Sequence, residues 1–214
     1  MRIALQTGKG NDSFSFQSRF NGEKSKQIRV SSIESEILAN GFFNFSDTII
    51  LYAKLSNIDE ENVKLFKSMC VLMNDFISTS ILEPKTDEIR LPFRGAISKG
   101  KCLVDKELQI HIGDPFIRAY KLAESQNWMG GAIDKTIDKD MMHEIIGFDK
   151  EIIEYCIPFN KNKSIESIKY ALNWQQSYPR RFGLKLQSQI NSHDWGKETE
   201  KKQNTLKFVE TVRQ

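Results

Sequence analysis

The chain has 214 residues, which suits one domain or one domain with an appended piece. Hydrophobic residues make up 39% of it and charged residues 28%, which is enough apolar material for a core and enough charge for solubility. The formal net charge is +3, from 31 basic and 28 acidic residues that are interleaved along the chain, so the charge does not indicate a nucleic-acid partner. Since no apolar run approaches the ~20 residues of a membrane-spanning helix, we also expect no membrane partner.

Cysteine usage predicts the compartment. Cys70, Cys102 and Cys156 are odd in number, far apart, and each in an apolar stretch. This pattern argues against a disulfide framework or a zinc site and favours core packing in a reducing cytosol. The first residues are too few and too polar for a signal peptide, so we expect a cytoplasmic protein.

The first predicted elements lie before residue 54. Residues 8–27 are rich in Gly, Ser, Asn, Lys and Gln and are expected to form a loop within a partly irregular N-terminal arm, residues 1–40. A short helix is expected over 32–39. Residues 41–53 place aromatic and β-branched residues on both sides of a Ser-Asp pair, which predicts a tight hairpin with that pair at its tip.

A long helix is expected from Asp59, because acidic residues favour a first turn and apolar residues then recur at spacings of three and four. This stripe comprises Val63, Phe66, Cys70, Met73, Ile77 and Ile81. Pro84 blocks continuation of the helix. Residues 89–98 and 101–104, separated by Gly100, suggest a second hairpin or a bent strand.

The second half alternates strands and helices. A strand over 109–112 stops at Gly113, where Asp114 suits a helix cap and Pro115 the first helical position, so a helix should follow to about residue 126. Gly130-Gly131 is expected to break the chain. The elements expected after it are a strand at 132–133, a short helix over 138–146, a strand pair over 151–157 and 165–174, and a charged helical tail from about 177.

These elements predict an α+β fold: a mixed, mainly antiparallel sheet covered by helices. We expect a core over residues 41–175 and a C-terminal helical extension over 176–214.

Asp47 is the leading candidate for chemistry. A carboxylate at a hairpin tip is well placed to hold Mg²⁺ or Mn²⁺, since hard cations in phosphate chemistry take one or two carboxylates. The alternative is that Asp47 is present only because turns favour aspartate.

Three ordered motifs resemble the catalytic domain of class III nucleotide cyclases. Residues 45–50, Phe-Ser-Asp-Thr-Ile-Ile, resemble the metal-binding hairpin of that family. Residues 94–100, Arg-Gly-Ala-Ile-Ser-Lys-Gly, resemble its strand and glycine turn after the long helix. Residues 112–124, which begin Ile-Gly-Asp-Pro-Phe-Ile-Arg, resemble its glycine-led helix. Segments at 155–159, 172–174 and 204–208 resemble a bacterial subgroup that includes pyrimidine cyclases of antiphage (Pycsar-like) defence.

The resemblance implies a nucleotide cyclase fold, related to ferredoxin-like folds. It also implies that a nucleoside triphosphate is converted to a 3′,5′-cyclic nucleotide and pyrophosphate in sites shared by two chains of a homodimer. It assigns the metal to Asp47, substrate binding to Ser46, Thr48 and Arg94, and stabilisation of charge on the reacting phosphate to Lys121 and Arg118.

The sequence departs from the family in two places. The family's first metal carboxylate lies on an opening strand that would fall at or before Met1, and Asp12 is in the wrong context to replace it. On the glycine-led helix, Ile117 aligns with an expected asparagine and Lys121 with an expected arginine. Arg118 follows Ile117 directly and could replace the asparagine. Alternatively, Arg118 and Lys121 both belong to a solvated face of the helix.

Two functions therefore compete: an active cyclase, and a catalytically inactive or truncated cyclase-homology protein that acts as a binding or partner subunit. A third, a nucleic-acid binder, rests only on mild basicity and the cluster Pro179-Arg180-Arg181.

Overall fold

The computed structural model describes residues 3–7, 14–18, 33–34, 36–37, 41–45, 48–82, 92–105, 107–108, 110–147, 150–160, 168–177 and 183–212. These residues belong to two compact units, Met1–Met69 and Cys70–Gln214. The predicted residues Asp12, Ser46, Asp47 and Pro84, and the cluster at 179–181, lie outside the described residues.

The first unit begins with two antiparallel strands, β1 (Ile3–Thr7) and β2 (Phe14–Ser18). Strand β2 falls inside the segment predicted as a loop, so that prediction was wrong there. The reason is a short alternation that the polar composition concealed: Phe14 and Phe16 are separated by Ser15, which is the period of a strand. The described residues between 33 and 37 are helical, as expected.

The predicted hairpin after residue 40 is confirmed. Strand β3 (Phe42–Phe45) pairs antiparallel with β4 (Thr48–Leu51), and Phe45 is the partner of Thr48. At the base, the Tyr52 amide donates to the Gly41 carbonyl oxygen at 2.7 Å. A Cβ on Gly41 would lie 1.7 Å from the Tyr52 carbonyl oxygen, so only glycine fits this closure.

The long helix is also confirmed as α2 (Asp59–Leu82), and the boundary between the two units falls within it. Its first turn carries Asp59, Glu60 and Glu61, which suits the positive end of the helix dipole. Phe66, Cys70 and Ile77 of the predicted apolar stripe are buried.

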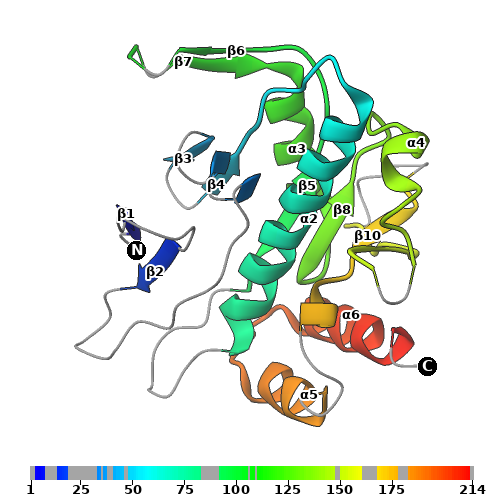
Figure 1. The fold of residues 1–214 in the computed structure, drawn as a ribbon. Coiled ribbons are helices and arrows are strands. Elements are labelled where there is room, and N and C mark those ends of the chain that lie inside the picture. The colour runs from blue at the N-terminus through cyan, green and yellow to red at the C-terminus, as the bar shows by residue number, and fades with distance from the viewer. Residues whose placement is uncertain are drawn as a thin grey trace. The chain divides into compact units, whose positions relative to one another are not determined.

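The second unit is built on one sheet with strand order β5 (Arg94–Ile97), β8 (Gly130–Ile133), β10 (Tyr170–Leu172) and β9 (Ile152–Glu154). The pair β5–β8 is parallel, and the other two pairs are antiparallel. Figure 1 shows this sheet with β5 and β8 side by side. Together with the antiparallel hairpins, it confirms the α+β class and the mixed, mainly antiparallel sheet.

Two local predictions in this unit were wrong. Of the two alternatives expected over 89–104, the hairpin is wrong, because β5 does not pair with β6 (Cys102–Asp105), which instead forms a hairpin with β7 (Ile110–Gly113). Gly130 and Gly131 lie in β8 and do not break the chain. Glycine is needed at both positions. A Cβ on Gly130 would lie 2.5 Å from the Trp128 ring, and a Cβ on Gly131 would lie 2.3 Å from the Leu172 side chain.

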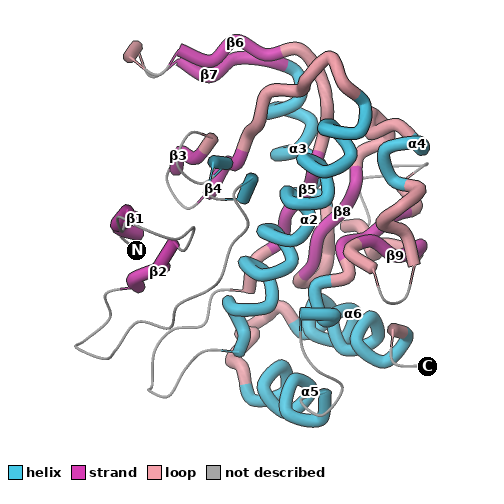
Figure 2. The backbone as a smooth tube through the Cα atoms, viewed as in Figure 1, coloured by secondary structure: helices cyan, strands magenta, loops and turns pink. Residues whose placement is uncertain are grey.

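The helices of the second unit follow the expected order. They are α3 (Asp114–Ser125), which packs against β5, then α4 (Lys139–Met142), a short 3₁₀ turn η1 (Trp174–Ser177), α5 (Gly183–Ser192) and α6 (Thr199–Thr211). Helix α3 begins one residue earlier than predicted, with Gly113 at its N-cap. Figure 2 shows α5 and α6 side by side. None of the described helices is long and apolar enough to cross a membrane.

Helix α6 is part of the core. The ring of Phe208, which is fully buried, lies between three other aromatic rings, with centroid distances of 4.7 Å to Trp128, 4.9 Å to Tyr155 and 5.7 Å to Trp174. We refer to these four residues as the aromatic core. The Met129 amide donates to the hydroxyl of Thr205 at 2.9 Å, which fixes α6 against the start of β8.

The cysteines follow the prediction only in part. Cys70 is buried and unpaired, as expected of a core residue, whereas Cys102 and Cys156 are exposed. Cys102 was misassigned because its apolar neighbours belong to the β6–β7 hairpin and not to the core.

Candidate functional site

The predicted metal-binding hairpin is described up to its tip. The pairing of Phe45 with Thr48 leaves only Ser46 and Asp47 between β3 and β4, and both lie outside the described residues. Thr48 opens β4 and is half-buried. The assignment of the metal to Asp47 therefore stays a prediction.

Arg94 lies at the start of β5 and binds the end of α3. Its Nη1 donates to the carbonyl oxygens of Glu124 at 3.2 Å and of Gln126 at 3.1 Å. A guanidinium at the C-terminal end of a helix satisfies carbonyls that have no partner within the helix. Arg94 thus holds α3 against β5, and its charge is already engaged within the chain.

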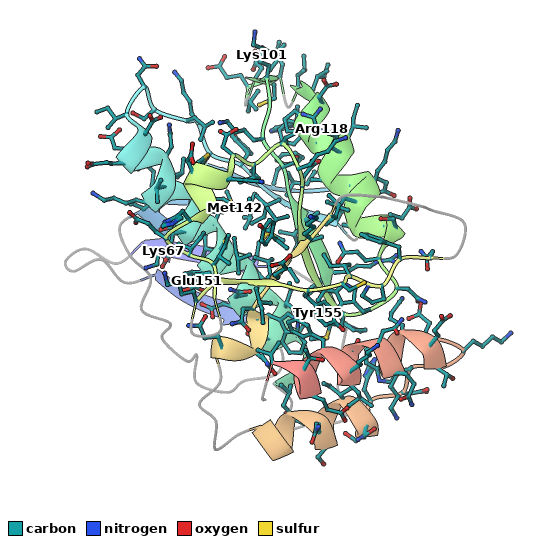
Figure 3. The ribbon with its side chains drawn as sticks, turned by 90° about the vertical axis from the view of Figure 1, so that its right-hand side faces the viewer. Lys67, Lys101, Arg118, Met142, Glu151 and Tyr155 are labelled. Carbon is teal, nitrogen blue, oxygen red and sulfur yellow. The ribbon has the colours of Figure 1, made fainter. Side chains whose placement is uncertain are left out.

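Arg118 lies near the opposite end of the β5–β8 pair. Its Nη2 donates to the carbonyl oxygen of Lys99, just after β5, at 3.0 Å. Its Nε lies 3.8 Å from Oδ2 of Asp134, just after β8, and Nη1 lies 3.8 Å from Oδ2 of Asp114. Figure 3 shows Arg118 at the same end of the second unit as Lys101, with Tyr155 toward the other end.

Asp134 is the centre of a polar cluster that sequence reasoning missed. Its side chain is only 7% exposed, and its Oδ1 accepts the Thr136 amide at 3.0 Å. The Thr136 hydroxyl in turn accepts the Lys99 amide at 3.0 Å, and the Lys99 ammonium pairs with Asp138. The signal was present in the sequence, since polar residues follow both strands at the carboxyl ends where ligands bind in parallel sheets. This pattern of polar residues identifies a cluster only when β5 and β8 are known to be parallel neighbours.

Lys121 lies on the outward side of α3, where its side chain is exposed. Ile117, one turn earlier, is 52% exposed, and Tyr120 is 55% exposed. This side of the helix is therefore available to solvent or to another molecule. Ile117 supplies no hydrogen bond at the position where the resemblance implies one.

The structure thus separates the predicted residues of the second unit. Arg94 lies at the amino end of the parallel β5–β8 pair and Arg118 at its carboxyl end, so the length of a four-residue strand, about 13 Å, lies between them. Lys121 is on the same helix as Arg118 but is exposed, whereas Arg118 is bound to the chain itself.

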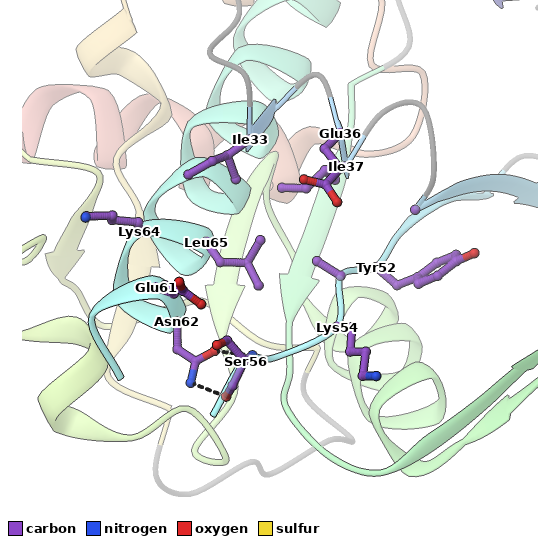
Figure 4. A pocket seen from close by; sticks show the side chains of 12 residues that line it. Ile33, Glu36, Ile37, Tyr52, Lys54, Ser56, Glu61, Asn62, Lys64 and Leu65 are labelled. Atoms are coloured by element: carbon purple, nitrogen blue, oxygen red, sulfur yellow. Dashed lines mark hydrogen bonds between the residues drawn. The ribbon is translucent and has the colours of Figure 1, made fainter. Parts of the chain in front are cut away.

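The first unit contains a cavity of about 450 Å³ at the base of the β3–β4 hairpin. Figure 4 shows apolar side chains in it beside charged ones on its border. Its lining includes Ile37, Tyr52 and Leu65, with Glu61 and Lys64 of α2. This volume is within the range of small-molecule sites. It borders Gly41 and Tyr52, the two residues whose hydrogen bond closes the base of the hairpin.

Among the residues that the structure describes, two side chains have clearly altered pKa values. Burial raises the pKa of the Cys70 thiol well above its usual value, and the nearby Glu151 carboxylate raises it further. Cys70 is therefore held as a thiol, which is a poor nucleophile. Burial also raises the pKa of Tyr155 to about 12, with a smaller contribution from Cys156.

Within the described ranges, no group of three or more His, Cys, Asp or Glu side chains is arranged to hold a metal ion. The predicted metal therefore depends on Asp47, which lies outside those ranges.

Comparison with known proteins identifies no relative of this chain: no protein-family model matches it, and neither do the curated proteins or the solved structures.

Proposed function

We propose that the chain is a nucleotide cyclase-like protein that converts a nucleoside triphosphate to a 3′,5′-cyclic nucleotide and pyrophosphate. In this reaction the 3′-oxygen forms a bond to the α-phosphorus, the bond from that phosphorus to the pyrophosphate oxygen breaks, and the 3′-hydroxyl proton leaves. The observation that carries the proposal is the register of β3 and β4, because the pairing of Phe45 with Thr48 leaves Ser46 and Asp47 as the only residues between the strands.

In the proposed site, Asp47 holds Mg²⁺ or Mn²⁺ and Ser46 and Thr48 bind the triphosphate beside it. The cation would neutralise phosphate charge and favour loss of the 3′-hydroxyl proton. Lys121 is the better of the two proposed catalytic cations, because its side chain is exposed while Arg118 donates to the Lys99 carbonyl. Delivered by the second chain of a homodimer, Lys121 would stabilise charge on the reacting phosphate. The resemblance to the antiphage subgroup extends the proposal to a pyrimidine substrate and a role in cytoplasmic defence signalling.

The test is incubation of the purified chain with each of the four ribonucleoside triphosphates and Mn²⁺, followed by mass spectrometry for a cyclic product. We expect product from at least one of them, abolished in Asp47→Ala and lowered about 100-fold in Lys121→Ala. Lys207→Ala, at an exposed position of α6, is the matched control and should retain activity. Absence of product with all four triphosphates at high protein concentration would overturn the proposal.

One observation favours the alternative of a catalytically inactive cyclase-homology protein that binds a nucleotide or a partner subunit. Ile117 is 52% exposed on α3 and cannot hydrogen-bond a phosphate. Titration calorimetry with the same triphosphates distinguishes the two functions, since the inactive protein would bind one of them and yet form no cyclic product. The variant Ile117→Asn supplies the amide, and a gain of activity in it would identify residue 117 as the cause of inactivity.

A further inference from the structure

Asp134 carries a buried carboxylate to which the proposed function gives no role. The residue follows β8 directly, and its side chain is 7% exposed. Its Oδ1 accepts the Thr136 amide at 3.0 Å, whereas its Oδ2 lies 3.8 Å from Nε of Arg118. Burial of a carboxylate is costly unless a positive charge lies near it. The guanidinium of Arg118 therefore offsets the cost of burying Asp134.

The guanidinium of Arg118 is itself held inside the chain. Its Nη2 donates to the Lys99 carbonyl oxygen at 3.0 Å. A Cβ on Gly100 would lie 2.7 Å from Nη2, so a side chain at this residue would displace the guanidinium. Its Nε is buried and has no hydrogen-bond partner among the residues that the structure describes. The charge of Asp134 dominates here, since the other nearby carboxylate, Asp114, is 79% exposed and screened by water.

These contacts join the start of α3 to the end of β5. The Ser98 hydroxyl, one residue after β5, donates to the Pro115 carbonyl oxygen in the first turn of α3 at 2.5 Å. At the other end of the helix, Arg94 of β5 donates to the carbonyl oxygens of residues 124 and 126. One arginine thus connects each end of α3 to β5 or to the turn that follows it, and Lys121 lies between these ends in the chain.

We propose that Asp134 is a positioning residue, which acts through Arg118 to fix the first two turns of α3 and thereby sets the position of Lys121. Arg118 then acts within the chain and does not contact the reacting phosphate. This inference deepens the proposed function, and its catalytic part rests on that function. Its structural part does not, because the contacts of Asp134 and Arg118 lie within the chain.

The first experiment is hydrogen exchange of the full chain, without nucleotide, followed by mass spectrometry. Asp134→Asn removes the charge but keeps an acceptor for the Thr136 amide, and Arg118→Gln removes the guanidinium. Each variant should raise the exchange rate of the amides of residues 118–121 about 10-fold, because the start of α3 opens more often. The double variant should exchange no faster than either single variant, since the two side chains act as one pair.

Three further measurements separate this effect from a general loss of structure. Asp140→Asn makes the same chemical change at an exposed position of α4 and should leave the exchange rate unchanged. Gly100→Ala keeps both charges and displaces only the guanidinium, so it should accelerate exchange of residues 118–121 even if Asp134→Asn does not fold. The amides of residues 205–209, in the buried part of α6, should stay protected in every folded variant.

The second experiment is steady-state kinetics with Mn²⁺ and a triphosphate that gives cyclic product. Asp134→Asn and Arg118→Gln should lower kcat by the same factor, about 10-fold, with KM unchanged, because a misplaced Lys121 acts only on the reacting phosphate. The double variant should be no slower than either single variant, and Asp140→Asn should keep the wild-type rate. If Arg118 contacted the phosphate itself, Arg118→Gln would lower kcat and Asp134→Asn would not.

Three results would overturn the inference: an exchange rate that a folded Asp134→Asn leaves unchanged, an exchange rate that Gly100→Ala leaves unchanged, or a double variant whose effect is the product of the two single effects. Because exchange is measured without nucleotide, faster exchange in the variants of a chain that makes no cyclic product contradicts only the proposed function. A chain that makes product and loses kcat in Arg118→Gln alone contradicts the positioning role.

Discussion

The aromatic core and the β6–β7 hairpin (residues 101–113, here called the arm) belong to the same unit and both contain large apolar side chains, yet their surroundings are opposite. In the core, Phe208 is fully buried among three aromatic rings. In the arm, Leu103 and Ile112 are more than half exposed. The difference separates residues that hold this unit together from residues that contribute little to its core. Substitutions in the two regions should therefore differ strongly in their effect on stability.

The largest effect is expected at the centre of the aromatic core. Phe208→Ala removes a fully buried ring and leaves a cavity, and should lower the free energy of unfolding by about 3–5 kcal/mol. Urea denaturation followed by circular dichroism measures the change. The neighbouring exposed substitution Lys207→Ala is the control. A loss below 1 kcal/mol for Phe208→Ala would mean that the core does not depend on α6.

The next effect concerns the attachment of α6 to the start of β8. Thr205→Val keeps the shape of the side chain but removes the acceptor of the buried Met129 amide. The amide is left unsatisfied, so the free energy of unfolding should fall by about 1–3 kcal/mol. Equilibrium denaturation again provides the measurement, with Thr211→Val, at an exposed position of α6, as the matched control. Equal stability of the two variants would contradict the role given to this hydrogen bond.

The pH dependence of the aromatic core gives a smaller effect. The pKa of Tyr155 is about 12 in the folded chain, above the usual value of 10. The folded state thus favours the neutral phenol. Its stabilising contribution is fully present below about pH 10 and is lost as the pH rises from about 10 to 12. Tyr155→Phe should lose less stability over that range than the wild type, as thermal melting at a series of pH values will show. An identical decline in the two proteins would remove Tyr155 as a cause.

The smallest effect on stability is expected in the arm. Leu103→Ser removes an exposed side chain and should change the free energy of unfolding by no more than about 0.5 kcal/mol when the chain is monomeric. Denaturation at low protein concentration measures it. A loss comparable to that of Phe208→Ala would mean that Leu103 is covered within the single chain, and the contrast between the two regions would fail.

The sequence predicted best those elements whose signals are local. The spacing of Phe66, Cys70 and Ile77 identified α2, and Asp114-Pro115 identified the start of α3 to within one residue. The aromatic residues around Ser46-Asp47 identified the β3–β4 hairpin.

Pairings between distant segments could not be predicted in this way. The partner of β5 is β8, which follows the arm and α3 in the chain, so the sequence suggested only a local hairpin or a bent strand over 89–104. Gly130 and Gly131 were misinterpreted for the same reason, because the side chain of Leu172 that excludes a Cβ at Gly131 comes from β10. At the candidate site, the resemblance named Arg118 and Lys121. Only the structure shows that Arg118 donates to the Lys99 carbonyl oxygen and that its Nε lies 3.8 Å from Oδ2 of the buried Asp134.

The parallel pairing of β5 with β8 has a consequence for folding kinetics. Arg94 and Gly130 are register partners, and the whole arm and α3 lie between them in the chain. The loss of chain entropy on closing this long segment must precede any gain from the pairing, so the sheet should form later than the helices and hairpins. Mutations that weaken the docking of α3 on β5 should therefore slow refolding more than they accelerate unfolding, because a docked α3 shortens the loop that the two strands must close.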